Sequence, residues 1–508
     1  MIKNLQPSLE KNTKLWGSYN TPLMLFLVII SIGVILRLRQ YLANRSLWLD
    51  EALLALNIIN KSFSELSQPL DYDQGAPLGF LWIEKSITVI LDSSEYSLRL
   101  FPLIGSILSL FVFYFIVLRY LNNKRTIFFA LLLYAISTPL IYYASESKQY
   151  TNDILMALLG INLLFPLIKE KTDLVPLALC TLGGAILIWM SHPVIFILVS
   201  VGLVATYSSL RQKNYYRTRL LIFVWAVWAV SFLSFYFLSL QDLTQNQYLL
   251  SYWDKSFVPW NNPLNSINWL INGFLKIFEY PVGLPLFGLA ALMYFIGIIS
   301  VFEKSKIFLF SLLLPLAFVF LAAFLHKYPF GDRHILFMVP LIIMLIAEGL
   351  DKTLSIFSSI RLHLVGLFLL GLFFYHPLIQ AGSYLIAPQL REEIRPAIEY
   401  VLANQQEGDI LYLYYASHKP FEYYLSAYNI NLDNDIIIGV ASRNDWSKYI
   451  MDLTKLREYK RVWLLFSHVH SSNGANEELL FLNYLNSIGG IQIDKYQTIG
   501  ASVYLYEF

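Results

Sequence analysis

The sequence predicts a polytopic α-helical membrane protein that carries a small α/β domain after its last membrane helix. Hydrophobic residues make up 56% of the 508 positions and charged residues only 14%, whereas a soluble globular chain carries roughly a quarter charged residues. The mean hydropathy of +0.54 agrees. The pattern changes near Ala381, after which short apolar strands alternate with helical segments. We therefore expect a membrane domain over 1–380 and an extracytoplasmic α/β domain over 381–508.

Net charge and cysteine content exclude several classes of function. The formal net charge is +2, and no Lys/Arg run resembles a stripe that follows a phosphate backbone. We therefore expect no nucleic-acid partner. The single cysteine, Cys180, lies within an apolar run. An intramolecular disulfide is thus impossible, and no cysteine-based metal site is supported.

Apolar runs of about the twenty residues needed to cross a bilayer recur along the chain and predict about eleven spans. They lie near 22–41, 98–120, 126–144, 151–168, 174–191, 193–210, 220–240, 283–302, 307–325, 334–350 and 362–380. A further run, Pro77–Leu91, is shorter and carries Glu84 and Lys85 in its middle. Charges are costly in hydrocarbon, so we predict an interfacial or re-entrant helix there.

The distribution of basic residues sets the orientation. If Pro77–Leu91 does not span, the short basic loops, such as 211–219 and 304–306, all fall on one side. The positive-inside rule makes that side cytoplasmic. We therefore predict a multi-pass protein of the plasma (inner) membrane with a cytoplasmic N-terminus. The long loops 42–97 and 241–282 then lie on the outer face, where we expect the chemistry.

Asp50 and Glu51 lie between apolar residues just after the first predicted span. One interpretation makes them first-turn acids of an interfacial helix, where the helix dipole favours negative charge. The other makes them reacting carboxylates at the membrane edge. The local sequence supports both equally.

Other ionisable residues lie at the outer ends of predicted spans. Arg99 begins the second span, where a cation must reach the interface or find an anion. Glu146 and Lys148 lie in the short loop 142–153, either as an ordinary polar cap or as the lining of a cavity. Arg333 leads into an apolar helix, and arginine suits bidentate phosphate recognition, although a snorkelling cation would look the same.

Aromatic, acidic and histidine residues of the outer segments have weaker interpretations. Trp and Tyr residues in 241–282 most plausibly form an interfacial belt, with stacking on a sugar as the minor alternative. Asp73 reads more readily as a solvated turn residue. His326 and His334 do not have the spacing of a helical metal-ligand pair. His468 and His470 share a strand face and could bind metal, but a capped strand end explains them better.

Several motifs together resemble the GT-C type of integral-membrane glycosyltransferases. The similarity is greatest to the branch with protein O-mannosyltransferases, the bacterial aminoarabinose transferase that acts on lipid A, and the rhizobial galacturonosyltransferases. The resemblance extends over essentially the whole membrane part, and the motifs that carry it are Leu47–Glu51, Gly75–Phe80, Tyr96–Pro102, Tyr143–Tyr150 and Tyr328–Phe337.

The resemblance implies inverting transfer of a sugar from a polyprenyl-phosphate-linked donor to a lipid, polysaccharide or protein acceptor on the outer face. It implies Asp50 as the general base and Glu51 as a residue that orients it or assists a cation. A base suits an acceptor hydroxyl that attacks the anomeric carbon.

The departing lipid phosphate gains charge and needs preorganised cations. The resemblance makes Arg99, Lys148 and Arg333 the candidates for these cations. It also implies substrate-binding roles for Glu146, Tyr150 and Asp73. No cofactor is certain. A divalent metal stays open, because some relatives of this type use one and others do not.

The main alternative is a polytopic lipid or polysaccharide transporter or flippase without transferase activity. Such a protein predicts functional residues deep within its spans. The charges here cluster at the outer ends of the spans, which favours surface chemistry. A degenerate, scaffold-like relative is a third interpretation, and the retained Asp50 argues against it.

Overall fold

The chain divides into two compact units in the computed structural model, which describes residues 20–169, 173–359, 361–428, 436–472 and 475–508. The first, which we call the membrane unit, comprises the described residues of 1–42, 63–84 and 99–388. The second, which we call the sheet unit, comprises those of 43–62, 85–98 and 389–508. Two segments of the predicted outer loop 42–97 thus belong to the same unit as the C-terminal residues.

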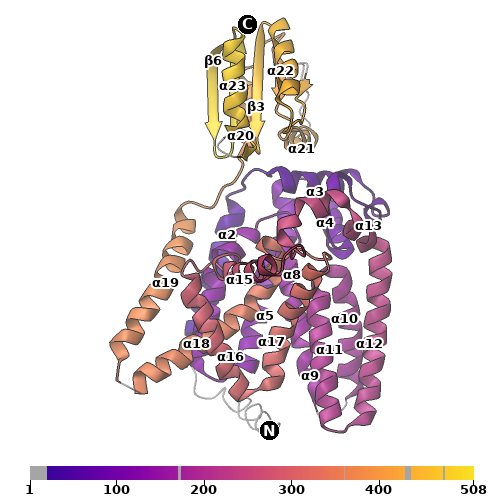
Figure 1. Cartoon of the computed structure of the whole chain (residues 1–508), viewed down its shortest axis with the longest axis vertical. Helices are drawn as coiled ribbons and strands as arrows, with labels where there is room; N and C mark the ends of the chain where they lie inside the picture. The colour runs from indigo at the N-terminus through magenta and orange to yellow at the C-terminus, as the bar shows by residue number, and fades with distance from the viewer. Residues whose placement is uncertain (1–19, 170–172, 360, 429–435, 473–474) are drawn as a thin grey trace. The chain divides into compact units, whose positions relative to one another are not determined.

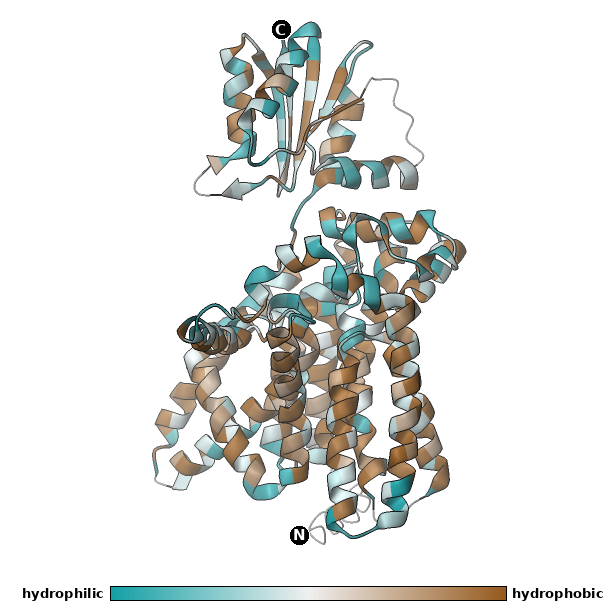
Figure 2. Ribbon diagram, turned by 45° about the vertical axis from the view of Figure 1, so that its right-hand side comes forward, coloured by the Kyte–Doolittle hydropathy of each residue, from teal (hydrophilic) through white to brown (hydrophobic). Residues whose placement is uncertain are grey.

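Nine helices in the described part of the chain are long and apolar enough to cross a membrane (Figure 1). Most of their length is hydrophobic, and polar residues gather toward their ends (Figure 2). The protein is therefore a multi-pass membrane protein. The nine are α2 (Asn20–Leu42), α5 (Glu95–Tyr120), α8–α9 (Tyr150–Asn162, Leu164–Ile168), α11 (Val194–Arg211), α12 with its continuation (Tyr215–Gln245), α16 (Phe287–Lys304), α17 (Lys306–Phe324), η7–α18 (Asp332–Met338, Val339–Ser359) and α19 (His363–Ile386).

Two further predicted spans account for the difference between nine and about eleven. The run near 174–191 forms α10 (Leu174–Met190), an apolar helix of 17 residues. The run near 126–144 forms two helices, α6 (Lys124–Ile136) and α7 (Thr138–Tyr143). The break lies at Ser137 (φ −59°, ψ 112°); in a continuous helix Pro139 would have no N–H to donate to the carbonyl oxygen of Ala135 and its ring would clash there, whereas in the first turn of α7 the missing N–H costs nothing. The break between the two helices follows from that proline.

Shorter helices occupy the predicted long loops. α3 (Leu49–Asn60) and α4 (Leu78–Ile90) have 12 and 13 residues, and a helix of 13 residues is only about 20 Å long. α4 is therefore too short to cross a bilayer. In loop 241–282, α14 (Gln247–Tyr252) precedes the amphipathic α15 (Pro263–Glu279). Leu264, Ile267 and Ile271 are exposed on α15 at helical spacing, which suits a helix that lies in a membrane interface.

Close backbone contact between α16 and α18 anchors the membrane unit. A Cβ atom added to Gly297 would lie 1.8 Å from the carbonyl oxygen of Leu345, and one on Gly349 would lie 1.8 Å from that of Met293. No side chain fits at either glycine. Small residues at such crossings let membrane helices approach closely and gain van der Waals contact, and most of α18 is buried.

The sheet unit contains a five-stranded sheet in the order β2-β1-β3-β7-β6. The strands are β1 (Ile410–Leu413), β2 (Ile436–Ile438), β3 (Arg461–Ser467), β6 (Ile491–Thr498) and β7 (Ala501–Glu507). β1 is parallel to both of its neighbours, β2 and β3, whereas β7 is antiparallel to both of its neighbours, β3 and β6. Parallel neighbours need crossover connections, and helices supply them (Figure 1). α21 (His418–Tyr428) lies in the connection from β1 to β2, and α22 (Trp446–Thr454) lies in the one from β2 to β3; α20 (Ile394–Asn404) precedes β1, and α23 (Glu477–Ser487) lies between β3 and β6. The predicted small α/β domain is confirmed.

Hydrogen bonds to Asp409 hold the start of β1 against β3. Its carboxylate accepts hydrogen bonds from Arg461 Nε (2.8 Å), Trp463 Nε1 (2.8 Å) and the backbone N–H of Gln406 (2.9 Å). Burial acts to raise the pKa of Asp409, but these hydrogen bonds outweigh it and hold the pKa below the ordinary value. The charged form is therefore the one that the fold binds.

We expect Asp409→Asn to destabilise the sheet by about 1–3 kcal/mol at neutral pH, because an amide cannot accept all three hydrogen bonds. The measurement is hydrogen exchange of the β1 and β3 amides in the full chain in detergent. Because the folded-state pKa is lowered, the contribution of Asp409 is present above the ordinary carboxyl pKa of about 4 and is lost as pH falls through the folded-state pKa. Glu407→Gln, at an exposed acid nearby, is the control. A difference that stays constant into acid would contradict the assignment.

Candidate functional site

Asp50 and Glu51 lie in the first turn of α3. The helix begins at Leu49, and the carbonyl oxygen of Trp48 accepts the N–H of Ala52 (3.0 Å). Negative charge at this position gains about 0.3–1 kcal/mol from the helix dipole. Both acids therefore have the location that the helix-end interpretation predicts, and their surroundings then distinguish them.

Glu51 is fully buried, whereas Asp50 is half-buried. Glu51 Oε2 lies 3.9 Å from Nη2 of Arg45, and both side chains are excluded from solvent. A buried carboxylate needs such a partner, because desolvation of a lone charge is costly. Glu51 is thus suited to hold the structure of the turn. Asp50 is the more accessible of the two acids.

In the membrane unit, a tight turn joins α7 to α8 and buries Glu146 and Lys148. The N–H of Lys148 donates to the carbonyl oxygen of Glu146 (2.7 Å), which closes the turn. Lys148 Nζ donates to Oε1 of Gln74 (2.7 Å), and Gln149 Nε2 donates to the carbonyl oxygen of Gly75 (3.3 Å). The segments 74–75 and 146–149, distant in sequence, therefore lie against one another.

Arg333 lies against two aromatic rings, one of which belongs to Tyr150, at the start of α8. It lies in η7 just after Gly331, whose φ of 125° suits glycine. The guanidinium carbon is 5.6 Å from the ring centroid of Tyr150 and 5.5 Å from that of Trp253. Both distances are within cation–π range. The structure thus brings Lys148, Tyr150 and Arg333 into one neighbourhood of the membrane unit.

The positions of Arg99 and Asp73 differ from that of the cluster. Arg99 is buried near the start of α5. The carbonyl oxygen of Pro102, less than a turn further along, accepts from the hydroxyl of Thr151 (2.9 Å), so this part of α5 packs against the first turn of α8. Asp73 is exposed and accepts a hydrogen bond from Nδ2 of Asn246 (2.7 Å). Its location is that of the solvated turn residue that the sequence favours.

Glu84 is a buried acid for which the sequence suggested no role. Its side chain is fully buried in α4, and neither carboxylate oxygen has a hydrogen-bond partner among the described residues. Burial raises the pKa of Glu84 well above its ordinary value. An ionised lone carboxylate would be costly there, so burial favours the neutral form of this acid.

The described residues contain no group of three or more His, Cys, Asp or Glu side chains that could hold a metal ion. The histidines that the sequence singles out have other contacts: His468 Nδ1 lies 2.8 Å from Glu392, and His334 packs edge-on against Trp253. The donors at the Lys148–Arg333 cluster are cationic, and they fit an anion rather than a metal.

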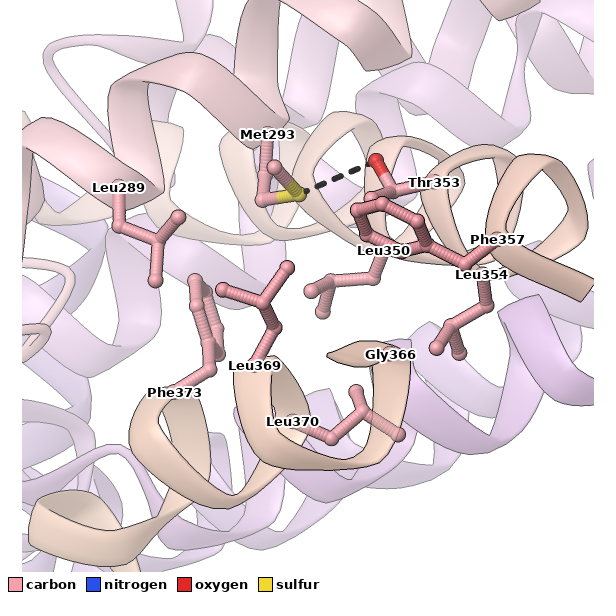
Figure 3. A pocket seen from close by; sticks show the side chains of 10 residues that line it. All are labelled: Leu289, Met293, Leu350, Thr353, Leu354, Phe357, Gly366, Leu369, Leu370 and Phe373. Atoms are coloured by element: carbon pink, nitrogen blue, oxygen red, sulfur yellow. Dashed lines mark hydrogen bonds between the residues drawn. The ribbon is translucent and has the colours of Figure 1, made fainter. Parts of the chain in front are cut away.

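A small apolar hollow lies between α16, α18 and α19 (Figure 3). Its volume of about 10 Å³ is close to the space that one water molecule occupies. Thr353 is its sole polar side chain, and its hydroxyl faces Sδ of Met293 at 3.5 Å. This hollow offers no chemistry and is too small for a sugar.

Three residues that contact the predicted site residues were not predicted from the sequence: Arg45, Gln74 and Trp253. Gln74 lies inside the Asp71–Pro77 motif, and Arg45 is a lone cation five residues before Asp50, so both left a signal in the sequence. Trp253 left none, because it is one of several aromatic residues in loop 241–282. Only the fold selects it.

No family model matches the sequence, and no curated protein matches it. Solved structures do. ArnT from Cupriavidus metallidurans in the apo state aligns with a TM-score of 0.51 at 10% identity, over 94% of this chain and 97% of that one. The chain has the GT-C fold of ArnT. The same protein bound to undecaprenyl phosphate aligns with a TM-score of 0.50 at 11% identity, over 95% and 97% of the two chains.

A third similar structure is the archaeal oligosaccharyltransferase AglB from Archaeoglobus fulgidus, in complex with an inhibitory peptide and a dolichol-phosphate. It aligns with a TM-score of 0.49 at 12% identity, over 96% of this chain and 74% of that one. The fold assignment rests on the two ArnT structures. Their coverage includes both the membrane helices and the C-terminal sheet, so the sequence-based prediction of a GT-C fold is confirmed.

We expect Arg45→Met to destabilise the start of α3 by about 3 kcal/mol, because removal of one partner leaves the other charge buried. In the double variant Arg45→Met/Glu51→Leu, most of this loss should be recovered, because two apolar side chains need no partner. Hydrogen exchange of the α3 amides measures both. If the double variant is no more stable than Arg45→Met, the ion pair is not what holds this turn.

Proposed function

We propose that the protein is a membrane glycosyltransferase that moves a sugar from a polyprenyl-phosphate-linked donor to a lipid, polysaccharide or protein acceptor, with inversion at the anomeric carbon. The observation that carries the proposal is the Lys148–Tyr150–Arg333 cluster, formed by two of the motifs that resemble GT-C enzymes, on a fold shared with ArnT. One of the ArnT structures is bound to undecaprenyl phosphate, which makes a lipid phosphate the natural ligand to test here.

The cluster suits the phosphate of the donor. Lys148 is buried and held by Gln74, and Arg333 is positioned between two aromatic rings. Cations fixed before the reaction stabilise charge that develops on a leaving group without reorganisation. When the bond between the anomeric carbon and the phosphate oxygen breaks, that phosphate gains negative charge. Arg99 belongs to the same proposal as a third cation at the adjoining end of α5.

Asp50 is the proposed general base. The acceptor hydroxyl attacks the anomeric carbon, its proton passes to the carboxylate of Asp50, and the lipid phosphate departs. One displacement inverts the configuration. Half-burial leaves Asp50 able to meet an acceptor, while the buried pair Arg45–Glu51 fixes the turn that carries it. Glu51 is therefore proposed as a positioning residue, and Glu146 as one that orders the turn that holds Lys148.

The proposed location is the plasma (inner) membrane, with a cytoplasmic N-terminus and the sheet unit outside. The short basic loops support this orientation through the positive-inside rule. The outer face is also where a transferase that uses a lipid-linked sugar would meet acceptors of the cell envelope.

Asp50→Asn should reduce the rate of transfer by about 10²–10⁴-fold, because an amide cannot take the proton. A strain that carries this variant should accumulate the same polyprenyl-phosphate-linked sugar as a deletion strain, which lipid profiling by mass spectrometry detects. Glu65→Gln, at an exposed acid before α4, is the matched control and should transfer normally. Undiminished sugar transfer by Asp50→Asn would refute Asp50 as the general base.

Cysteine labelling tests the orientation. In a Cys180→Ser background, Glu65→Cys should react with an impermeant maleimide from outside intact cells, and Arg211→Cys should react only after permeabilisation. Both positions are exposed, so accessibility to the reagent depends on the side of the membrane. The reverse labelling pattern would overturn the proposed topology.

A further inference from the structure

The segment before α20 holds the chain that leads into α3. Glu393 Oε2 accepts from the backbone N–H (3.1 Å) and the hydroxyl (3.2 Å) of Ser46. Glu392 Oε2 accepts from the N–H of Leu49 (3.2 Å), which immediately precedes Asp50. Both glutamates are buried. Two consecutive carboxylates thus fix residues 46–49 within the sheet unit.

The second oxygen of Glu392 faces a histidine. Its Oε1 lies 2.8 Å from Nδ1 of His468, which directly follows β3 and has a left-handed φ of 52°. Non-glycine residues rarely adopt this conformation, and where they do it often marks a functional position. Trp48 lies nearby in the same unit, with its ring 6.1 Å from that of His468 and the guanidinium of Arg391 above it. Glu392 therefore connects the start of α3 to the end of β3.

A polar cavity of about 570 Å³ opens at this point. Small-molecule sites typically have volumes of about 300–1,000 Å³. The residues that line it lie at the end of β3, at the β6–β7 hairpin, in the first turn of α23 and before α20, and they include Arg391, Glu392, His468, Glu478, Gln497 and Thr498. All of them belong to the sheet unit.

The lining is ordered by its own hydrogen bonds. Gln497 Nε2 donates to the hydroxyl of Tyr504 (2.8 Å), which donates to Oε1 of Glu478 (2.8 Å). The hydroxyl of Ser502 donates to the same oxygen. Glu478 Oε2 adds acceptor capacity that these bonds do not use, since each carboxylate oxygen accepts more than one hydrogen bond.

The chemistry of this lining selects a class of ligand. Two carboxylates against Arg391 and His468 give no excess of positive charge, so a phosphate is disfavoured. The described residues form no metal-binding group, and the polar wall does not suit a lipid chain. Carboxylates, an amide and hydroxyls offer acceptors and donors to the many hydroxyl groups of a sugar.

We propose that this cavity binds a neutral sugar residue of a substrate, and that Glu392 links its occupancy to the position of the first turn of α3. The inference rests on the proposed function for the identity of the substrate, but binding of a sugar can be measured without any transfer. The sugar would belong either to the acceptor or to the lipid-linked donor, and the chemistry of recognition is the same for both.

Saturation-transfer NMR on the full chain in detergent tests the site, with neutral methyl hexosides and pentosides as probes at millimolar concentration. At least one glycoside should receive saturation from the native protein, and the signal should fall several-fold in Glu478→Gln and in Gln497→Ala. Gln497 is exposed on the hairpin, so its variant keeps the test valid if Glu478→Gln does not fold. Glu399→Gln, an exposed acid on α20 outside the cavity, is the control.

Two NMR results would overturn the proposal. One is that no neutral glycoside receives saturation from the protein, and the other is that the saturation-transfer signal is equal in the cavity variants and the native protein. Sugar binding without glycosyltransferase activity would keep this inference and refute the proposed function, whereas activity without sugar binding would do the reverse. Displacement of the glycoside by lipid-linked sugar from the deletion strain identifies the donor as the source. Its retention identifies the acceptor.

Hydrogen exchange tests the link through Glu392. In the native protein, a bound glycoside should change the exchange of the α3 first-turn amides several-fold. In Glu392→Gln, which keeps an acceptor for Leu49 but not the charge that faces His468, this change should be lost even when the glycoside concentration is raised until its saturation-transfer signal equals that of the native protein. A glycoside effect on α3 that is equal in both proteins would remove Glu392 as the link.

Discussion

The hydrogen bonds that hold the Ser46–Leu49 segment against the residues before α20 are the constraint on which the turn that carries Asp50 depends. A loop after a membrane span has no packing of its own, and without partners its backbone would sample many conformations at about 1–2 kcal/mol of entropy per residue. Glu392 and Glu393 supply those partners. Arg395 adds a hydrogen bond to the carbonyl oxygen of Asn44 (2.7 Å) and an ion pair with Glu95 (2.6 Å). The turn with Asp50 is thus built by the sheet unit.

Glu95 shows why the predicted outer loop is not one structural element. It is buried, and besides Arg395 it accepts hydrogen bonds from the hydroxyls of Tyr424 (3.0 Å) and Tyr428 (2.7 Å) on α21. Tyr424 in turn accepts from the N–H of Leu47 (2.9 Å). A buried carboxylate with several charge-assisted hydrogen bonds is costly to disrupt. The segments 43–62 and 85–98 therefore belong with the C-terminal residues, while 63–84 belongs to the membrane unit.

In the proposed transfer, the cations and the acid are held in place by different physical means. The cation cluster of the membrane unit uses burial, a hydrogen bond to Gln74 and aromatic rings to hold Lys148 and Arg333 in place. The acidic turn of the sheet unit uses a helix start and a buried ion pair. Each arrangement is held by contacts within its own unit. This preorganisation is what electrostatic catalysis requires.

The sequence by itself determined the fold class, the approximate number of spans and the strand–helix order of the C-terminal domain. Hydrophobic length and periodicity are local properties that survive in any tertiary context. It also marked Asp50, Lys148 and Arg333, because charges at the ends of apolar helices are conspicuous. Tertiary structure alone decided that Trp253 faces Arg333 and that Glu392 holds Leu49. These pairs are separated by 80 and 343 residues, and a contact between such distant residues depends on how whole elements pack, which no local pattern encodes.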